Sequence, residues 1–251
     1  MGIGGCAVGL CAPLTGIKKM INSPKNYKMR IVFRWADNQA EHSHALRGIK
    51  KMVLDSGLPY EPSKFVTSQP RLAYGPAPAK GQRAEREYLD IYLLERRSEE
   101  EVRAALLQTA PSGFEILQLT RVPYPLPSVQ NLMAAIRYRV KGDFSAYISS
   151  GRKLEDWNGM SQLAVTVQAL NGITYEKNLT DGLLASRVLG PQEIELTLVP
   201  ISGQWIRPQW FMAAWLDIPV PAQDENFTVE GFDFIRQELC WRDTQGVYHT
   251  I

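Results

Sequence analysis

Cysteine and histidine are scarce in this chain, and long apolar runs are missing. The 251 residues include three histidines and three cysteines, Cys6, Cys11 and Cys240. A small, odd number of cysteines excludes a disulfide scaffold and favours a reducing compartment, so a cytoplasmic location is expected. No apolar run approaches the roughly 20 residues with which a helix crosses a bilayer. The sequence therefore predicts a protein without a membrane span.

The signatures of common catalytic and metal sites are missing as well. The chain has no Gly-x-Ser-x-Gly, no phosphate-binding Walker loop and no dinucleotide fingerprint. Cys6 and Cys11 have no second cysteine pair and no histidine nearby, which makes a zinc or iron–sulfur site a weak hypothesis. The sequence thus predicts no bound metal and no cofactor, and it gives catalysis little local support.

Positive charge is concentrated near the N-terminus. The formal net charge is only +2. Residues 1–60 contain nine Lys or Arg against three Asp or Glu, a balance of +6, and the remainder has 19 against 23, a balance of −4. A basic stretch of this size is compatible with phosphate contacts, and equally with a solvated face.

Residues 29–122 carry the clearest structural pattern, after a glycine-rich stretch at 1–28 that is expected to be a flexible leader. The spacing of apolar residues predicts a strand at 29–35, a basic amphipathic helix at 44–56, a short strand at 71–75, a strand at 87–94, a helix after the Ser98–Glu101 capping box, and a strand at 114–122. On short, right-handed connections this βαββαβ order gives a four-stranded antiparallel sheet with both helices on one face, the ferredoxin-like arrangement.

The second half of the chain repeats this pattern less clearly. Residues 123–128 contain three prolines and predict a stiff linker between domains. In residues 129–251, strands are expected at 133–141, 173–179, 193–199 and 234–241, with a helix starting at Pro208, whereas 144–170 fits strand or helix. The predicted fold class is therefore α+β, with two tandem ferredoxin-like (βαββαβ) modules built on antiparallel sheets.

Cations and aromatic rings gather on the first helix and on the loop that follows it. Cations for phosphates and ring faces for bases are what a single-stranded nucleic acid needs. The alternative is a proline-stiffened cover over one sheet edge. Trp210 is a further candidate, because it falls off the apolar face of its helix. The candidate binding residues are Arg47, Lys50, Lys51, Lys64, Phe65, Arg71, Tyr74, Lys80, Arg83, Arg207 and Trp210.

Several short motifs together resemble a known family. They are Ser43-His44, the helix end Gly57-Leu58-Pro59-Tyr60, the segment 69–77 (Gln-Pro-Arg-Leu-Ala-Tyr-Gly-Pro-Ala), the strand start 87–91, the helix start Trp205-Ile206-Arg207-Pro208 and the last-strand segment 235–238. Over roughly residues 29–242 the chain resembles the radical-SAM-linked protein family, a bacterial domain of unknown function fused to, or encoded beside, a radical SAM protein. The chain departs from the family at 65–71, where the expected asparagine and histidine are absent.

The resemblance implies a partner of a radical SAM enzyme in an RNA-linked setting. The chain itself has no three-cysteine motif for a radical SAM cluster. Our leading hypothesis is a non-catalytic RNA-binding or adaptor protein that works with a radical SAM enzyme or another large protein complex. One alternative is an RNA-processing nuclease with His44 or His42 as general acid or base. Another is a structural subunit or assembly factor of a protein complex.

Overall fold

The computed structural model describes residues 26–36, 42–78, 82–149, 163–168, 172–221, 227 and 229–251. The predicted leader lies outside these ranges, apart from its last three residues. The described chain forms three sheets, which are mostly antiparallel, and a few short helices, so the α+β class is confirmed. Within the described ranges, no helix is long and apolar enough to cross a membrane.

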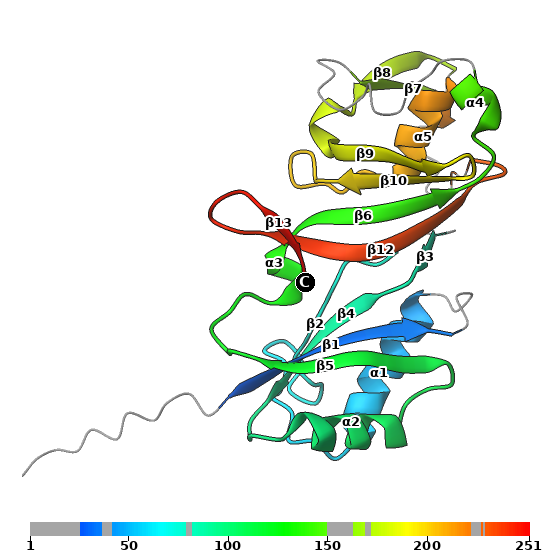
Figure 1. Ribbon diagram of the computed structural model, residues 1–251. Helices are drawn as coiled ribbons and strands as arrows, with labels where there is room; N and C mark the ends of the chain where they lie inside the picture. Colours follow the sequence, from blue (N-terminus) through cyan, green and yellow to red (C-terminus); the bar gives the residue numbers. More distant parts are fainter. Residues whose placement is uncertain are drawn as a thin grey trace, which may run out of the picture.

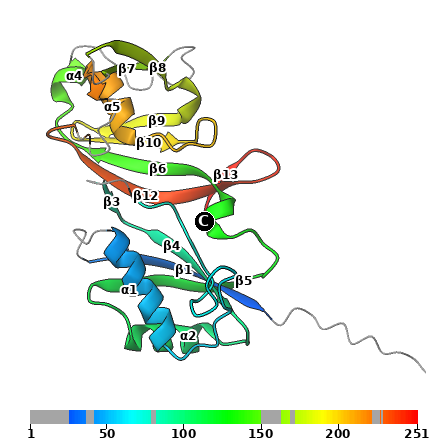
Figure 2. The same ribbon diagram turned by 180° about the vertical axis from the view of Figure 1, so that it is seen from behind.

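The first sheet contains the strands expected in the N-terminal half. Its members are β1 (Tyr27–Trp35), β2 (Leu72–Tyr74), β4 (Glu87–Leu93) and β5 (Phe114–Val122), in the order β2-β4-β1-β5, and every neighbouring pair is antiparallel. The helices α1 (His42–Asp55) and α2 (Glu99–Gln108) cover one face of this sheet (Figures 1 and 2). α1 begins at His42, two residues before the start predicted from the sequence.

Alternation along β1 decides which face carries the helices. Met29, Ile31 and Phe33 are buried in one core together with α1 residues such as Met52 and α2 residues such as Leu106. The residues of this core recur at every second position of β1, as in a half-buried strand, and they pack against the apolar stripe of an amphipathic helix. The residues between them on β1 therefore point to the opposite face of the sheet.

The capping box predicted at the start of α2 is present. The Glu101 backbone N–H donates to the Ser98 hydroxyl over 3.1 Å, and the Ser98 backbone N–H donates to the Glu101 carboxylate over 2.7 Å. These two bonds satisfy donors that the first turn of a helix otherwise leaves unpaired.

Ser98→Ala should lower the free energy of unfolding by about 1 kcal/mol, because the N-cap acceptor is lost. Ser128→Ala is the matched control. Ser128 occupies the N-cap position of α3 (Val129–Leu132), but its side chain makes no capping hydrogen bond. Urea denaturation of both variants measures the difference. Equal losses would contradict a capping role for the Ser98 side chain.

The second half forms a larger sheet with a smaller one beside it. The larger sheet has the order β13-β12-β6-β10-β9 and consists of β6 (Met133–Lys141), β9 (Leu183–Gly190), β10 (Glu193–Leu198), β12 (Asp233–Arg242) and β13 (Tyr248–Thr250). The smaller sheet has the order β11-β7-β8 and consists of β7 (Ala164–Gln168), β8 (Thr174–Asn178) and β11 (Val220–Pro221). The ambiguous segment thus contains a strand, β7, and α4 (Ser145–Ser149). The helix α5 (Pro208–Leu216) packs near β7, and a 3-10 turn, Thr180–Gly182, precedes β9.

One strand crosses from the first half of the chain into the second sheet. β3 (Gln82–Ala84) lies between β2 and β4 in sequence, but it pairs in parallel with β12. The Gln82 side chain donates to Gln209 of α5 over 2.9 Å, in a buried contact. In addition, Val32 and Tyr88 from the first sheet are buried in the core of the second half. The two large sheets therefore face each other, with α1 and α2 on the outside (Figure 1).

The segment predicted as a linker runs along this inner face of the first sheet. Lys28, fully buried, donates to the backbone carbonyls of Leu126 and Pro127. The Asp90 carboxylate accepts the Val129 backbone N–H over 2.8 Å at the start of α3. Residues 126–129 thus cover the inner face of the first sheet beside Lys28 of β1 and Asp90 of β4.

Candidate functional site

The predicted basic surface combines α1 with the loop at 61–70. The α1–loop surface consists of Arg47, Lys50, Lys51, Lys64 and Phe65. The Lys50 ammonium lies 3.5 Å from the Gln69 side-chain oxygen, which places the loop beside the helix. The Phe65 side chain is 97% exposed, an uncommon position for a phenylalanine.

The loop that carries Phe65 is braced by its own backbone. The Ser63 N–H donates to the Gln69 carbonyl over 2.8 Å, and the Gln69 N–H donates to the Val66 carbonyl over 2.9 Å. The Phe65 N–H donates to the Ser63 hydroxyl over 3.3 Å. The exposed ring is therefore presented by a folded turn at the surface.

The charges of the α1–loop surface are accessible to solvent. Lys51 forms an ion pair with Asp55 one helical turn later, yet its side chain remains 76% exposed. Exposed pairs of this kind contribute only about 0.3–0.5 kcal/mol on a helix. A phosphate that approaches this surface can thus compete for Lys51 at little energetic cost.

Arg71 and Tyr74, two candidates that follow this loop, make internal contacts instead. Arg71 donates to Glu61 and to the Tyr124 hydroxyl, both over 2.7 Å, and its guanidinium lies 4.0 Å from the centre of the Tyr92 ring. Tyr74 packs against the first core, and burial raises the pKa of its hydroxyl. Both residues fasten β2 to its surroundings, whereas Lys80 lies outside the described residues.

The remaining candidates are distributed over other parts of the molecule. Arg207 occupies the N-cap position of α5, and Trp210 is half-buried against the second core, with the Lys177 ammonium 4.4 Å from its ring centre. Figure 1 places α5 and α1 at opposite ends of the molecule. His42 and His44 lie in the first turn of α1, and their side chains are outside the described part. Together these candidates do not form one site.

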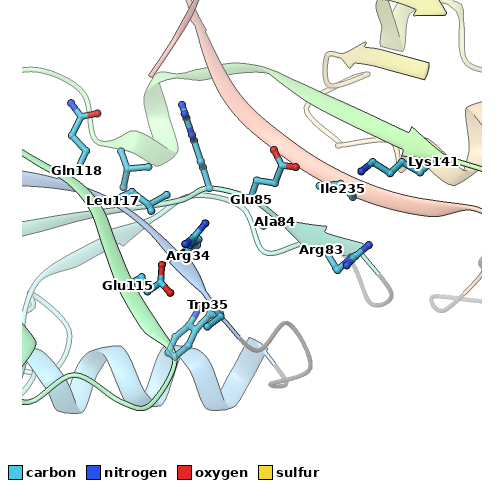
Figure 3. Close-up of a pocket in the computed structure, with 13 residues that line it drawn as sticks. Arg34, Trp35, Arg83, Ala84, Glu85, Glu115, Leu117, Gln118, Lys141 and Ile235 are labelled. Carbon is cyan, nitrogen blue, oxygen red and sulfur yellow. Dashed lines mark hydrogen bonds and ion pairs between the residues drawn. The ribbon is translucent and has the colours of Figure 1, made fainter. Parts of the chain in front are cut away.

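A cleft with charged walls, the inter-sheet cleft, lies between the two large sheets and has a volume of about 860 Å³. Its walls come from the ends of β1 and β6, from β3 with the two residues after it, and from the starts of β5 and β12. Figure 3 shows Arg34 and Glu115 on the first-sheet side, with Arg83 and Lys141 at the other end. The charged lining residues are Arg34, Arg83, Glu85, Arg86, Glu115 and Lys141.

Carboxylates orient the arginines of this cleft. The Arg34 Nε atom lies 2.6 Å from a Glu115 oxygen, Arg83 is paired with Asp233, and an Arg86 nitrogen lies 3.7 Å from Glu238. Each of these pairs involves only some of the five N–H donors that a guanidinium offers. A guanidinium that is paired through some of its N–H groups can offer the others to an anionic ligand.

Sequence analysis found only Arg83 among the cations of the cleft. Arg34, Arg86 and Lys141 belong to no local motif. They meet because β3 crosses to β12 and carries residues 83–86 between the two sheets. In the part of the chain that the structure describes, no group of His, Cys, Asp and Glu side chains is arranged to hold a metal ion.

The fold and these surfaces define an α+β protein with two facing, mostly antiparallel sheets and a cationic cleft between them. The chain belongs to a family of uncharacterized proteins conserved in bacteria (DUF2344), whose sequence profile matches residues 28–208. The match runs from β1 to the first residue of α5, so it includes strands of all three sheets. A search of curated proteins finds no match.

Proposed function

We propose that this protein is a non-catalytic RNA-binding adaptor and that its α1–loop surface contacts single-stranded RNA. The observation that carries the proposal is the 97% exposed Phe65 ring beside Lys64 and the cations of α1. Single-stranded RNA is bound by cations that follow its phosphates and by rings on which its bases stack. The α1–loop surface offers both kinds of group.

The covered sheet face supports this choice of surface. Four-stranded sheets that bind RNA stack bases on aromatic residues of their open face. Here Tyr88 is buried against the second half of the chain, and Tyr92 is covered by Arg71 and Tyr124. Bases cannot reach these rings, so an exposed ring outside the sheet is needed for stacking.

We also propose that the fold consists of two tandem ferredoxin-like modules. In a ferredoxin-like sheet, the second, third, first and fourth strands of the βαββαβ unit lie side by side in that order. The strand orders β2-β4-β1-β5 and β9-β10-β6-β12 both have this arrangement. This agreement supports two tandem ferredoxin-like modules, the second of which carries the inserted strands β7 and β8. The sequence resemblance supports a radical SAM enzyme as the protein partner, and the scarcity of cysteine supports a cytoplasmic setting.

Phe65→Ala should weaken binding of an unstructured, fluorescently labelled RNA by about 5- to 150-fold, because one stacked base is worth about 1–3 kcal/mol. Fluorescence anisotropy at constant salt measures the change. Leu126→Ala, which removes a 52% exposed side chain elsewhere on the surface, is the control and should bind as the native protein does. Native affinity in Phe65→Ala would refute stacking on this ring.

The salt dependence of RNA binding tests whether Lys50 and Lys51 contact phosphates. In Lys50→Ala/Lys51→Ala, the slope of log affinity against log salt should flatten by about 1.4, since each phosphate contact to a single strand contributes about 0.7. Arg97→Ala/Arg187→Ala removes the same charge from exposed pairs elsewhere and should leave the slope unchanged. An adaptor also requires a protein partner. If the chain binds no RNA and co-purifies with a protein complex that nuclease treatment does not disrupt, it is a structural subunit instead.

A further inference from the structure

We propose that the inter-sheet cleft binds the phosphate group of a small phosphorylated ligand. This site is separate from the α1–loop surface, so it stands or falls independently of the RNA proposal. Three of its cations are labelled in Figure 3: Arg34 from β1, Arg83 from β3 and Lys141 from β6. The fourth, Arg86, comes from the residues after β3. The two halves of the chain thus build the site jointly.

The size of the cleft selects a small molecule. Ligand sites for small molecules have volumes of roughly 300–1,000 Å³, and the cleft has about 860 Å³. A nucleic-acid duplex makes contacts over a much larger surface. The cleft therefore suits a metabolite or the end of a chain better than a double helix.

The net charge of the lining selects an anion. Asp233 and Glu238 pair with Arg83 and Arg86 from outside the lining, where Glu238 also pairs with Arg137. The lining itself holds four cations, Arg34, Arg83, Arg86 and Lys141, and two carboxylates, Glu85 and Glu115, a balance of +2. Both carboxylates are engaged by cations: Glu115 bonds to Arg34, and Glu85 lies 3.8 Å from Arg139. They hold the cations in place and do not reverse the sign of the site.

The existing ion pairs do not block the site. The Arg34 and Glu115 side chains are 52% and 44% exposed, and those of Arg83 and Arg86 are 49% and 50% exposed. Exposed pairs contribute about 0–1 kcal/mol, whereas charge-assisted bonds between a guanidinium and a phosphate are among the strongest hydrogen bonds in proteins. A phosphate therefore gains more from these arginines than they lose by adjusting their positions.

The lining favours recognition of the phosphate rather than of an aromatic ring. The Trp35 ring reaches the edge of the cleft, but it packs against Phe33 and Phe114, with ring centres 6.4 and 5.4 Å apart. Both contacts are edge-to-face, and they hold the half-buried ring in the first core. Arginine forks and a lysine point charge suit the oxygens of a phosphate, and the affinity should accordingly depend on the number of phosphates more than on the attached group.

The test is isothermal titration calorimetry on the full chain with adenosine, AMP, ADP and pyrophosphate. We expect no binding of adenosine and saturable binding of ADP and pyrophosphate that weakens with salt. Arg34→Gln and Lys141→Ala should each weaken pyrophosphate binding by about tenfold or more, because a hydrogen bond to a charged group contributes about 1.5–3 kcal/mol. Arg97→Gln, which breaks a comparable surface pair with Glu95, should leave it unchanged.

A second comparison distinguishes the two sources of the phosphate. If a trinucleotide with a 5′-phosphate binds in the cleft and its 5′-hydroxyl counterpart does not, the source includes RNA ends; if only ADP and pyrophosphate bind, the ligand is a free metabolite. Phe65→Ala should leave the affinities for ADP and pyrophosphate unchanged, because Phe65 belongs to the α1–loop surface and not to the cleft. The proposal is overturned if none of the phosphorylated probes binds, or if Arg34→Gln and Lys141→Ala, with native circular dichroism, bind pyrophosphate as the native chain does.

Discussion

Asp90→Ala should lower the free energy of unfolding by about 3–5 kcal/mol, the range found when one partner of a buried ion pair is removed. Asp90 is fully buried, and both of its oxygens are engaged. Arg30 donates to them over 2.8 and 3.0 Å, and the Val129 backbone N–H donates over 2.8 Å. The substitution leaves the Arg30 guanidinium, whose side chain is only 12% exposed, without its carboxylate. Denaturant unfolding followed by tryptophan fluorescence measures the loss.

A matched pair on the same strand provides the control. Arg34 follows Arg30 by four residues on β1 and also bonds to a carboxylate, that of Glu115 on β5, but both of those side chains are about half exposed. Glu115→Gln should therefore change stability by less than about 1 kcal/mol. A similar loss in the two variants would mean that burial does not control the strength of these pairs.

The regular elements with strong period-two patterns were predictable from sequence. The strands at 114–122 and 133–141 have the predicted limits, and the capping box marks the start of α2. In these segments the local preference agrees with the tertiary environment, because each strand has one buried face. Alternation of apolar and polar residues then records the burial directly.

Sequence analysis missed β3 and β9, and the reason differs between the two strands. β3 has three residues and is held by β12, which follows it by about 150 positions in the chain. β9 is the edge strand of its sheet, and most of its residues are exposed or half-buried, so its apolar residues do not mark one face. The pairing of β3 depends on a long-range contact, which a local pattern does not encode, whereas β9 pairs with the next strand, β10, and was missed because of its exposed residues.

The candidate sites were predicted only in part for the same reason. The α1–loop surface lies on consecutive elements, so a search for charge near aromatic residues found it. The inter-sheet cleft joins Arg34 and Lys141, which are 107 positions apart in the sequence, through the crossing of β3. A charged residue at the end of a strand gives no sign of which distant charge it will meet. This cleft could be found only from the fold.

Arg236→Met should also lower the free energy of unfolding by about 3–5 kcal/mol. Arg236, on β12, is 1% exposed; its guanidinium donates to the Pro76 carbonyl and lies 3.5 Å from the Glu87 carboxylate. These contacts link the first sheet to the second. Methionine fills part of the space but leaves the Pro76 oxygen and the Glu87 carboxylate without this donor.

The loss in Arg236→Met should depend on pH. Burial raises the pKa of Glu87 in the native protein, and the charge of Arg236 opposes that rise. Without Arg236, the native-state pKa of Glu87 moves further above its value in the unfolded chain. The protonated carboxyl is then favoured in the folded state, so the variant keeps most stability below the ordinary glutamate range and loses it as pH rises through the native-state pKa. Urea denaturation between about pH 4 and about pH 7 measures this trend.

The double variant Arg236→Met/Glu87→Gln tests the cause. A glutamine has no charge to bury, so the double variant should recover part of the stability at neutral pH and should lose the added pH dependence, because breaking a buried pair costs more than replacing both of its partners. Glu115→Gln in the Arg236→Met background is the control, since Glu115 is paired with Arg34 and does not contact Arg236. If the pH trend persists in Arg236→Met/Glu87→Gln, a group other than Glu87 responds to the loss of Arg236, and the ion pair between the sheets is not what stabilises this contact.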